Sequence, residues 1–197
     1  MEKQNNLAIV IPAYKSTFLA AALDSIAAQT CLDFTLYIGD DHSSNNLKEI
    51  VDRYRDKINL VYKRFDTNLG GKDLVAQWER CIDMTQGEEW LWLFSDDDVM
   101  EKNCVEEFYK TIKEKPKAGL IHFNVNRLDN ATGKISPLPK FPDFCSSKFY
   151  LDEKLKGHLI SFVVEFVVRR DVFFDNGRFQ NFDLAWGSDF ISWVKSY

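Results

Sequence analysis

The hydrophobic positions of the first 125 residues follow two alternating patterns. Five short runs of β-branched, aromatic and other apolar residues predict buried strands, at 7–12, 34–39, 58–63, 90–94 and 118–125. Between these runs, apolar positions recur at helical spacing, which predicts helices within 16–29, 46–57, 72–84 and 101–114. Strands that alternate with helices predict an α/β fold, with a mostly parallel sheet and helices on both of its faces.

Two of these helices follow residues that favour a helix start. Ser16 or Thr17 can cap the first helix, because a hydroxyl oxygen accepts a hydrogen bond from a free backbone N–H of the first turn. Asp97 or Asp98 can cap the helix predicted within 101–114 in the same way.

The pattern becomes less regular after residue 125. A hairpin or loop is expected around Thr132 and Gly133, because this dipeptide lies in a polar stretch. Three prolines within 136–144 argue against regular structure there. We therefore expect residues 126–157 to be largely irregular and to shape one side of a binding site.

The last predicted elements are one strand and two helices, at 162–168, from Asp171 and from Ser188. Glu165 interrupts the apolar run of that strand, so it is either paired or faces an acceptor cleft, and we favour the cleft. The chain ends at Tyr197 inside the final helix, so we expect its C-terminal part to be cut short. The length suits one domain. We divide that domain into a first half at 1–125 and a second half at 126–197.

Polar side chains follow four of the predicted strands. They are Tyr14 with Lys15, Asp40 with Asp41, residues 68–72, and the run Asp96, Asp97 and Asp98. Open parallel sheets bind ligands outside the carboxyl ends of their strands, so these side chains mark the predicted ligand site. Asp41 can accept a hydrogen bond from a nucleobase, and Lys72 can pair with a phosphate, so a nucleoside diphosphate fits this edge.

The three consecutive acids allow two interpretations. Carboxylates held side by side repel one another, and a divalent cation relieves that repulsion. Mg²⁺ takes one or two protein carboxylates and completes its shell with water and substrate phosphates. The alternative is the helix cap already described for Asp97 and Asp98. The second acidic pair, Asp40 with Asp41, favours the metal because it belongs to the same predicted edge.

Composition excludes several classes of protein. The formal charge is −5 and no block of lysine and arginine occurs, which argues against nucleic acid as a partner. The four cysteines show no metal-binding spacing and indicate reduced thiols. No leader segment and no run near the roughly 20 apolar residues of a membrane span is present, so the expected location is the cytoplasm. Neither a Walker A loop nor a GxGxxG motif follows a strand.

Five segments together carry a resemblance to a known family. "AIVIPAYKSTFLAAALDSIAAQT" and "DFTLYIGDDHSSN" are followed by "NLGG", by "SDDDVM", and by "FVVRRDVFFDNGRF" with "GSDFISW". In this order they resemble family 2 glycosyltransferases of the GT-A fold. The resemblance implies a nucleotide diphosphate sugar as donor, with uridine favoured by family habit, and inversion at the anomeric carbon.

The resemblance also implies roles for individual residues. On the donor side, the nucleoside would lie against Pro12, Ala13 and Tyr14, with Asp41 reading the base, Asp40 supporting it and Asp96 facing the ribose or pyrophosphate. Asp97 matches the acid that binds Mg²⁺ or Mn²⁺, and Asp98 is the second metal candidate. Asp189 matches the general base. Ser95 stands where the family's usual string has its first acid, and the usual arginine–asparagine pair of the third helix is missing.

Two other functions remain open at this point. A nucleotidyltransferase that makes sugar nucleotides shares this kind of sheet, but it usually has a glycine-rich loop after its first strand, where "PAYKSTF" has no glycine. The other is a non-catalytic module that binds a nucleotide sugar. For a transferase, the resemblance implies a saccharide or lipid-linked acceptor used in cell-surface polysaccharide synthesis. It leaves open a peripheral association with the inner face of the cell membrane and the oligomeric state.

Overall fold

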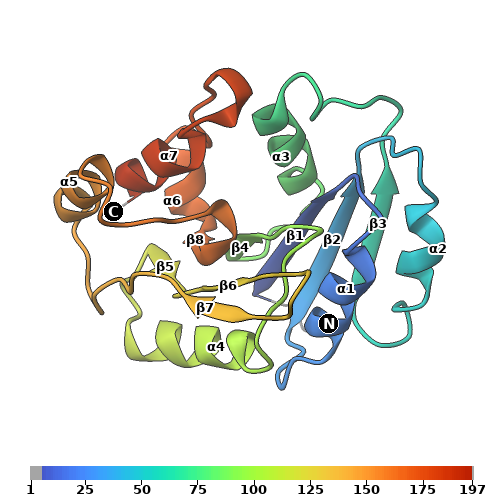
Figure 1. Cartoon of the computed structure of the whole chain (residues 1–197), viewed down its shortest axis with the longest axis horizontal. Coiled ribbons are helices and arrows are strands. Elements are labelled where there is room, and N and C mark those ends of the chain that lie inside the picture. Colours follow the sequence, from blue (N-terminus) through green and yellow to red (C-terminus); the bar gives the residue numbers. More distant parts are fainter. Residues whose placement is uncertain (1–5, 197) are drawn as a thin grey trace.

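A central six-stranded sheet organises the protein, whose computed structural model describes residues 6–196. The strand order is β3-β2-β1-β4-β8-β5 (Figure 1). The strands are β1 Leu7–Ala13, β2 Phe34–Asp40, β3 Leu60–Arg64, β4 Trp90–Leu93, β5 Leu120–His122 and β8 Phe166–Arg169. The strands β3, β2, β1 and β4 run parallel to one another, while β8 is antiparallel to both β4 and β5. The predicted mostly parallel sheet is therefore confirmed.

Helices cover both faces of the sheet, also as predicted. They are α1 Leu19–Ala27, α2 Leu47–Asp52, α3 Leu74–Ile82, α4 Cys104–Glu114, α5 Ser147–Leu155, α6 Arg170–Asp175 and α7 Ser188–Ser196. One core packs α1, α2 and α4 against one face of the sheet, and a second core packs α3, α5, α6 and α7 against the other. Two 3-10 turns, η1 Val163–Glu165 and η2 Asp183–Ala185, precede β8 and α7. The predicted last helix is observed up to Ser196, and Tyr197 lies outside the described residues.

The apolar run of β1 is continuous because the strand is buried on both faces. Leu7, Ile9 and Ile11 pack into the first core, whereas Ala8 and Val10 pack into the second. Successive side chains of a strand point to opposite faces, so a strand between two helical layers needs apolar residues at every position.

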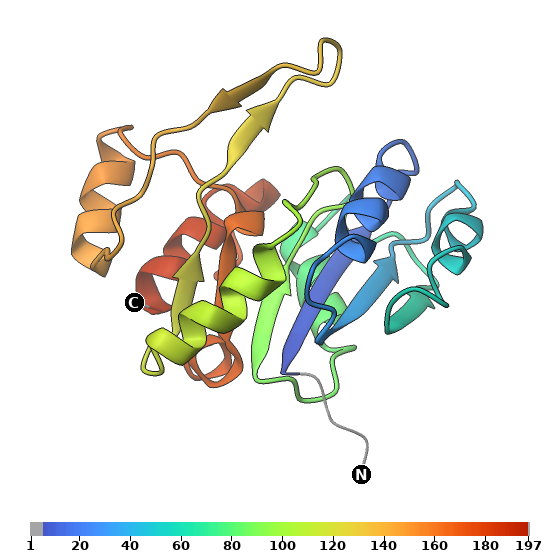
Figure 2. The ribbon, with the colours of Figure 1, turned by 90° about the horizontal axis from the view of Figure 1, so that it is seen from below.

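The predicted hairpin is present beyond the main sheet. Strands β6 Asn126–Leu128 and β7 Ile135–Pro137 pair antiparallel around a turn in which Gly133 has a φ of 68°. Figure 2 shows this hairpin extending away from the body of the molecule. Strand β8, from the second half of the chain, enters the sheet formed by the first half. The division of the domain at residue 125 stays a prediction.

The prediction that residues 126–157 are largely irregular is wrong for α5. The Ser146 hydroxyl caps this helix by accepting a hydrogen bond from the Phe149 N–H at 3.2 Å. Gly157, with a φ of 73°, follows its last turn. Only Tyr150 is buried in the helix, so no apolar stripe marks it in the sequence.

Two predicted helix caps are also wrong. Helix α1 begins at Leu19 after Phe18, so neither Ser16 nor Thr17 caps it. Helix α4 begins at Cys104 after Asn103, several residues beyond the three acids. Asp97 and Asp98 therefore do not cap it.

The close approach of β2 and α3 at Gly39 gives a first prediction. A β-carbon at Gly39 would collide with the Sγ atom of Cys81 and would lie 2.9 Å from the Phe65 ring. Gly39→Ala should therefore destabilise the protein by about 1–3 kcal/mol, as overpacked cores do. Urea unfolding measures this loss. The double variant Gly39→Ala with Cys81→Ala should lose less than the sum of the two single variants, and strictly additive losses would contradict the proposed collision.

Candidate functional site

A pocket of about 250 Å³ lies at the carboxyl ends of β1 and β2. Its walls come from the ends of these strands, from the loop after β3 and from the start of α3. The lining residues are Pro12, Tyr14, Asp41, Asn68, Gly70, Gly71, Leu74 and Gln77. The sheet therefore brings Pro12, Tyr14 and Asp41 together, as expected for a donor site. Ala13, buried in β1 between Pro12 and Tyr14, does not line the pocket.

Asp40 is fully buried at the end of β2 and stabilises the loop that follows. Its carboxylate accepts hydrogen bonds from the Ser43 N–H at 2.8 Å, the Tyr62 hydroxyl at 2.6 Å and the Arg64 guanidinium at 3.0 Å. Burial and the neighbouring Asp40 carboxylate raise the pKa of Tyr62, so this hydroxyl remains a donor. Asp40 thus supports the shape of the pocket from behind.

Asp41 fixes the loop that closes the pocket. Its two oxygens accept hydrogen bonds from the N–H groups of Leu69 at 2.7 Å and Gly70 at 2.8 Å, and from the Asn68 amide at 3.0 Å. A β-carbon at Gly70 would lie 2.8 Å from Asp41, so the loop needs glycine to come this close. The fourth donor is the Arg80 guanidinium, which forms an ion pair with Asp41.

Arg80 is a site residue that the sequence analysis missed. Its guanidinium lies 3.9 Å from the centre of the Phe65 ring and also contacts Gln77. The signal that could have found it is its position on α3, three residues after Gln77, which places both side chains on one side of the helix. The Arg80 guanidinium therefore contacts Asp41, the acid expected to bind the base.

Asp96 connects the end of β4 to the end of β1. One carboxylate oxygen accepts the backbone N–H groups of Tyr14 at 2.8 Å and Lys15 at 2.9 Å. Burial raises the pKa of Asp96, and these two N–H groups act in the opposite direction. The acid therefore holds the segment on which a nucleoside would lie.

Asp97 and Asp98 differ from Asp96 because they are exposed. The Ser95 hydroxyl donates a hydrogen bond to Asp97. Partial burial and the negative charges of Asp97, Glu165 and Asp96 raise the pKa of Asp98. These acids concentrate negative charge at one place, and a divalent cation would relieve their repulsion.

The residues present fit a cation that a diphosphate also holds. Within residues 6–196, no group of three or more His, Cys, Asp or Glu side chains is arranged to bind a metal by itself. Mg²⁺ needs only one or two protein carboxylates when substrate phosphates supply other ligands. The exposed carboxylates of Asp97 and Asp98 meet that requirement. The neighbouring Asp96 instead accepts two backbone N–H groups.

Lys72 lies in the loop between β3 and α3, one residue before the cap residue Asp73. Its side chain is exposed and forms no ion pair within the described part of the chain. It does not line the pocket, although Gly70 and Gly71 of the same loop do.

Asp189 is the second residue of α7 and is half-buried. Burial raises the pKa of this carboxyl, while the Phe190 N–H and the charge of Lys154 act in the opposite direction. Asp189 does not line the pocket at the carboxyl ends of β1 and β2, so the structure does not join it directly to the predicted donor residues. Glu165 provides a link, because its charge acts on both Asp98 and Lys154.

Glu165 and His122 form a pair, so the expectation that Glu165 faces an acceptor cleft is wrong. Glu165 is buried and its Oε2 lies 2.7 Å from His122 Nε2. Its other oxygen accepts the Phe162 N–H at 3.0 Å. Glu165 ends η1 instead of lying in the predicted strand, and its polar partners are inside the protein, as burial of a carboxylate requires.

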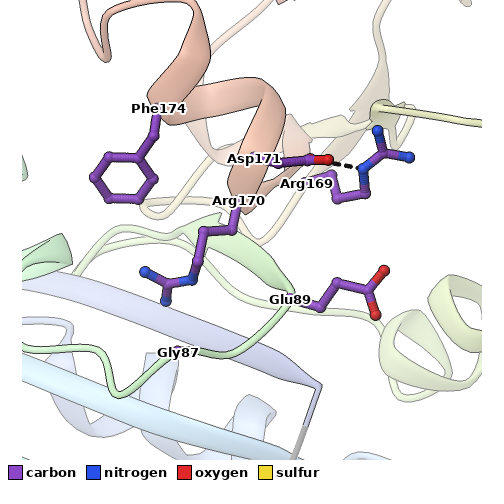
Figure 3. A pocket seen from close by; sticks show the side chains of 6 residues that line it. All are labelled: Gly87, Glu89, Arg169, Arg170, Asp171 and Phe174. Atoms are coloured by element: carbon purple, nitrogen blue, oxygen red, sulfur yellow. Dashed lines mark hydrogen bonds and ion pairs between the residues drawn. The ribbon is translucent and has the colours of Figure 1, made fainter.

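A larger pocket, of about 710 Å³, lies at the opposite end of the sheet, where β4 begins and β8 ends (Figure 3). Its arginines already have protein partners. Arg169 pairs with Asp171 at 2.7 Å, and Arg170 donates to the Thr85 hydroxyl at 2.7 Å and to the Glu88 carbonyl. The smaller pocket lies where parallel strands present their loops, next to the strand that the three acids follow.

Comparisons with known proteins agree with this geometry. The sequence matches the model of the family described as Glycosyl transferase family 2 over residues 8–174. It is 26% identical over 149 residues to glycosyltransferase GlyG of Streptococcus pneumoniae serotype 4, which covers 75% of this chain and 48% of GlyG. It is 30% identical over 110 residues to the poly(ribitol-phosphate) beta-N-acetylglucosaminyltransferase TarS of Staphylococcus aureus, over 54% of this chain and 18% of TarS.

Solved structures share the fold. A crystal structure of S. aureus TarS in complex with UDP-GlcNAc matches with a TM-score of 0.77 at 21% identity, covering 98% of this chain and 53% of the other. The mannosyltransferase PcManGT from Pyrobaculum calidifontis, in complex with GDP-Man and Mn²⁺, matches with a TM-score of 0.65 at 13% identity, over 95% of this chain and 50% of the other. These likenesses confirm the predicted GT-A fold.

The chain spans about half the length of GlyG and of the crystallised TarS chain. In the part of the chain that the structure describes, none of the helices is both long and apolar enough to cross a bilayer. The family model covers most of the sequence, including all of the strand ends that form the pocket. The chain therefore belongs to glycosyl transferase family 2.

Proposed function

We propose that this protein is an inverting glycosyltransferase that moves a sugar from a UDP-linked donor to a hydroxyl of a saccharide or lipid-linked acceptor. The observation that carries the proposal is the pocket at the carboxyl ends of β1 and β2, with Asp96, Asp97 and Asp98 following the adjacent strand β4. The crystal structure of TarS in complex with UDP-GlcNAc supports a UDP sugar as the donor.

In the proposed complex, the nucleoside lies against Pro12 and Tyr14, with Ala13 buried behind them, and Asp41 faces the base while Asp40 supports it. Lys72 is proposed to pair with the diphosphate, and Asp96 to face the ribose or pyrophosphate. Polymer synthesis at the cell surface fits the name of TarS, a poly(ribitol-phosphate) glycosyltransferase. A location in the cytoplasm, with a peripheral association at the inner face of the membrane, belongs to this proposal.

Asp97 and Asp98 are the residues that would hold Mg²⁺ or Mn²⁺. A bound divalent cation would neutralise the charge of the departing diphosphate. The complex of PcManGT with GDP-Man and Mn²⁺ supports this role. The carboxylates themselves would fix where the diphosphate end of the donor lies relative to the pocket.

Asp189 is proposed as the general base. The acceptor oxygen forms a bond to the anomeric carbon as the bond from that carbon to the diphosphate oxygen breaks, and the hydroxyl proton passes to Asp189. Attack on the face opposite the leaving group inverts the configuration. A carboxylate is a weak base for an alcohol, so proton transfer comes late, in an oxocarbenium-like transition state.

The metal role gives a prediction on donor binding. UDP with Mn²⁺, at 100 times its dissociation constant, should stabilise the protein by about 2.7 kcal/mol. For a chain of this size, each kcal/mol of stabilisation raises the Tm by roughly 2–4 °C. Asp97→Ala should lose the part of the shift that depends on Mn²⁺, because one carboxylate ligand is removed.

Thermal unfolding of the purified chain measures these shifts, with UDP, UDP-GlcNAc and GDP-mannose as ligands. The matched control is Asp56→Ala, which removes an exposed acid from the turn before β3. No stabilisation by any of these ligands with Mn²⁺ or Mg²⁺ would contradict the donor site. A full metal-dependent shift in Asp97→Ala would contradict the metal assignment.

The base assignment gives a separate prediction on turnover. Asp189→Asn should bind UDP-GlcNAc with Mn²⁺ as the unchanged protein does, but should release UDP about 10²–10⁴ times more slowly, as expected for loss of a general base. UDP release with water as the acceptor is measurable without knowing the natural acceptor. Asp183→Asn, in the exposed first position of η2, is the control. Undiminished turnover of Asp189→Asn would refute the assignment.

A further inference from the structure

Helix α5 brings a cation to the start of α7. Lys154 is half-buried, whereas the next lysine of this segment, Lys156, is exposed and pairs with Glu153 at 2.8 Å. The ammonium group of Lys154 lies 5.6 Å from the centre of the Phe190 ring, and Phe190 directly follows Asp189. Tyr150, on the same helix, contacts the Phe190 ring edge-on at 5.4 Å. Helices α5 and α7 are therefore packed together at the first turn of α7, which contains Asp189.

Two carboxylates act on this ammonium group, Asp189 and Glu165. Glu165 already has the Phe162 N–H and the His122 ring nitrogen as partners. The other charged groups of η2 and α7 are engaged elsewhere or exposed, since Lys195, in the last turn of α7, donates to Gln180 at 2.8 Å and Asp183 is exposed on η2. Of the two carboxylates, Asp189 acts on Lys154 the more strongly.

We propose that Lys154 is a positioning residue of the transfer reaction, and that it supplies the positive charge that keeps the Asp189 carboxylate ionised. The proposal rests on the proposed role of Asp189 as general base. A carboxylate can accept the acceptor's proton only in its ionised form, and burial at the start of α7 disfavours that form. A nearby cation opposes this effect without touching the substrate.

The titration of Asp189 tests the proposal without any need for activity. Carbon-13 NMR of labelled aspartate carboxyls follows each titration in the 197-residue chain, and the resonance missing from Asp189→Asn identifies Asp189. Lys154→Met should raise the midpoint of Asp189 by about one pH unit, because an opposite charge is lost. Lys154→Arg should restore the original midpoint. Lys156→Met, which removes an exposed lysine two residues further on, should leave it unchanged.

The pH dependence of UDP release gives the second measurement. Because the ionised base is the active form, Lys154→Met should move the acidic limb of kcat/KM to higher pH, with about a tenfold loss at pH values below both midpoints. Lys154→Arg should restore that limb. Methionine keeps an apolar chain against Phe190, and equal thermal unfolding temperatures would show that packing is preserved.

An unchanged Asp189 midpoint in Lys154→Met overturns the proposal, whatever the activity of the protein. A raised midpoint with an unmoved acidic limb also overturns it, because the charge would then not act on turnover. Failure of the proposed function has a different signature, in which Asp189→Asn releases UDP as fast as the unchanged protein does.

Discussion

Three buried carboxylates at the carboxyl edge of the sheet determine how the loops of the site lie. Burying an ionised carboxylate is costly unless donors surround it, so each acid requires particular backbone segments to approach. Asp40 is surrounded by donors from its own loop and from β3. Asp41 draws in the loop at 68–71, and Asp96 draws in the residues that follow β1. The pocket is the space that these three constraints leave between the loops.

The run of three acids after β4 therefore contains two kinds of carboxylate. Asp96 is buried and accepts two backbone N–H groups with one of its oxygens, whereas Asp97 and Asp98 remain exposed. Repulsion within the run is not removed by a helix N-terminus, because α4 begins only at Cys104. A cation shared with a diphosphate is the charge that would balance these acids, which is why donor and metal are proposed to bind together.

The sequence predicted those parts of the molecule that depend on local pattern. The buried strands and amphipathic helices of the first half follow from apolar periodicity, and the acids at the strand ends follow from the order of the elements. Helix α5 was missed because it buries only Tyr150. The donors of Asp96 could not be predicted either, because Tyr14 lies 82 positions away and only the folded sheet brings it close. The same holds for Arg80 beside Asp41 and for His122 beside Glu165.

The direction of β8 explains why both halves of the chain meet at the proposed site. A strand parallel to β4 would present its end at the carboxyl edge, but β8 is antiparallel to β4 and to β5. Its start, and not its end, therefore lies beside the end of β4, with Val167 opposite Trp92. Glu165 immediately precedes that start, so its charge reaches Asp98 on one side and Lys154 of α5 on the other. The reversed strand β8 thus places the acids of the first half and the helices of the second half around the same edge of the sheet. The other end of β8 lies at the larger pocket, where Arg169 and Arg170 already have protein partners.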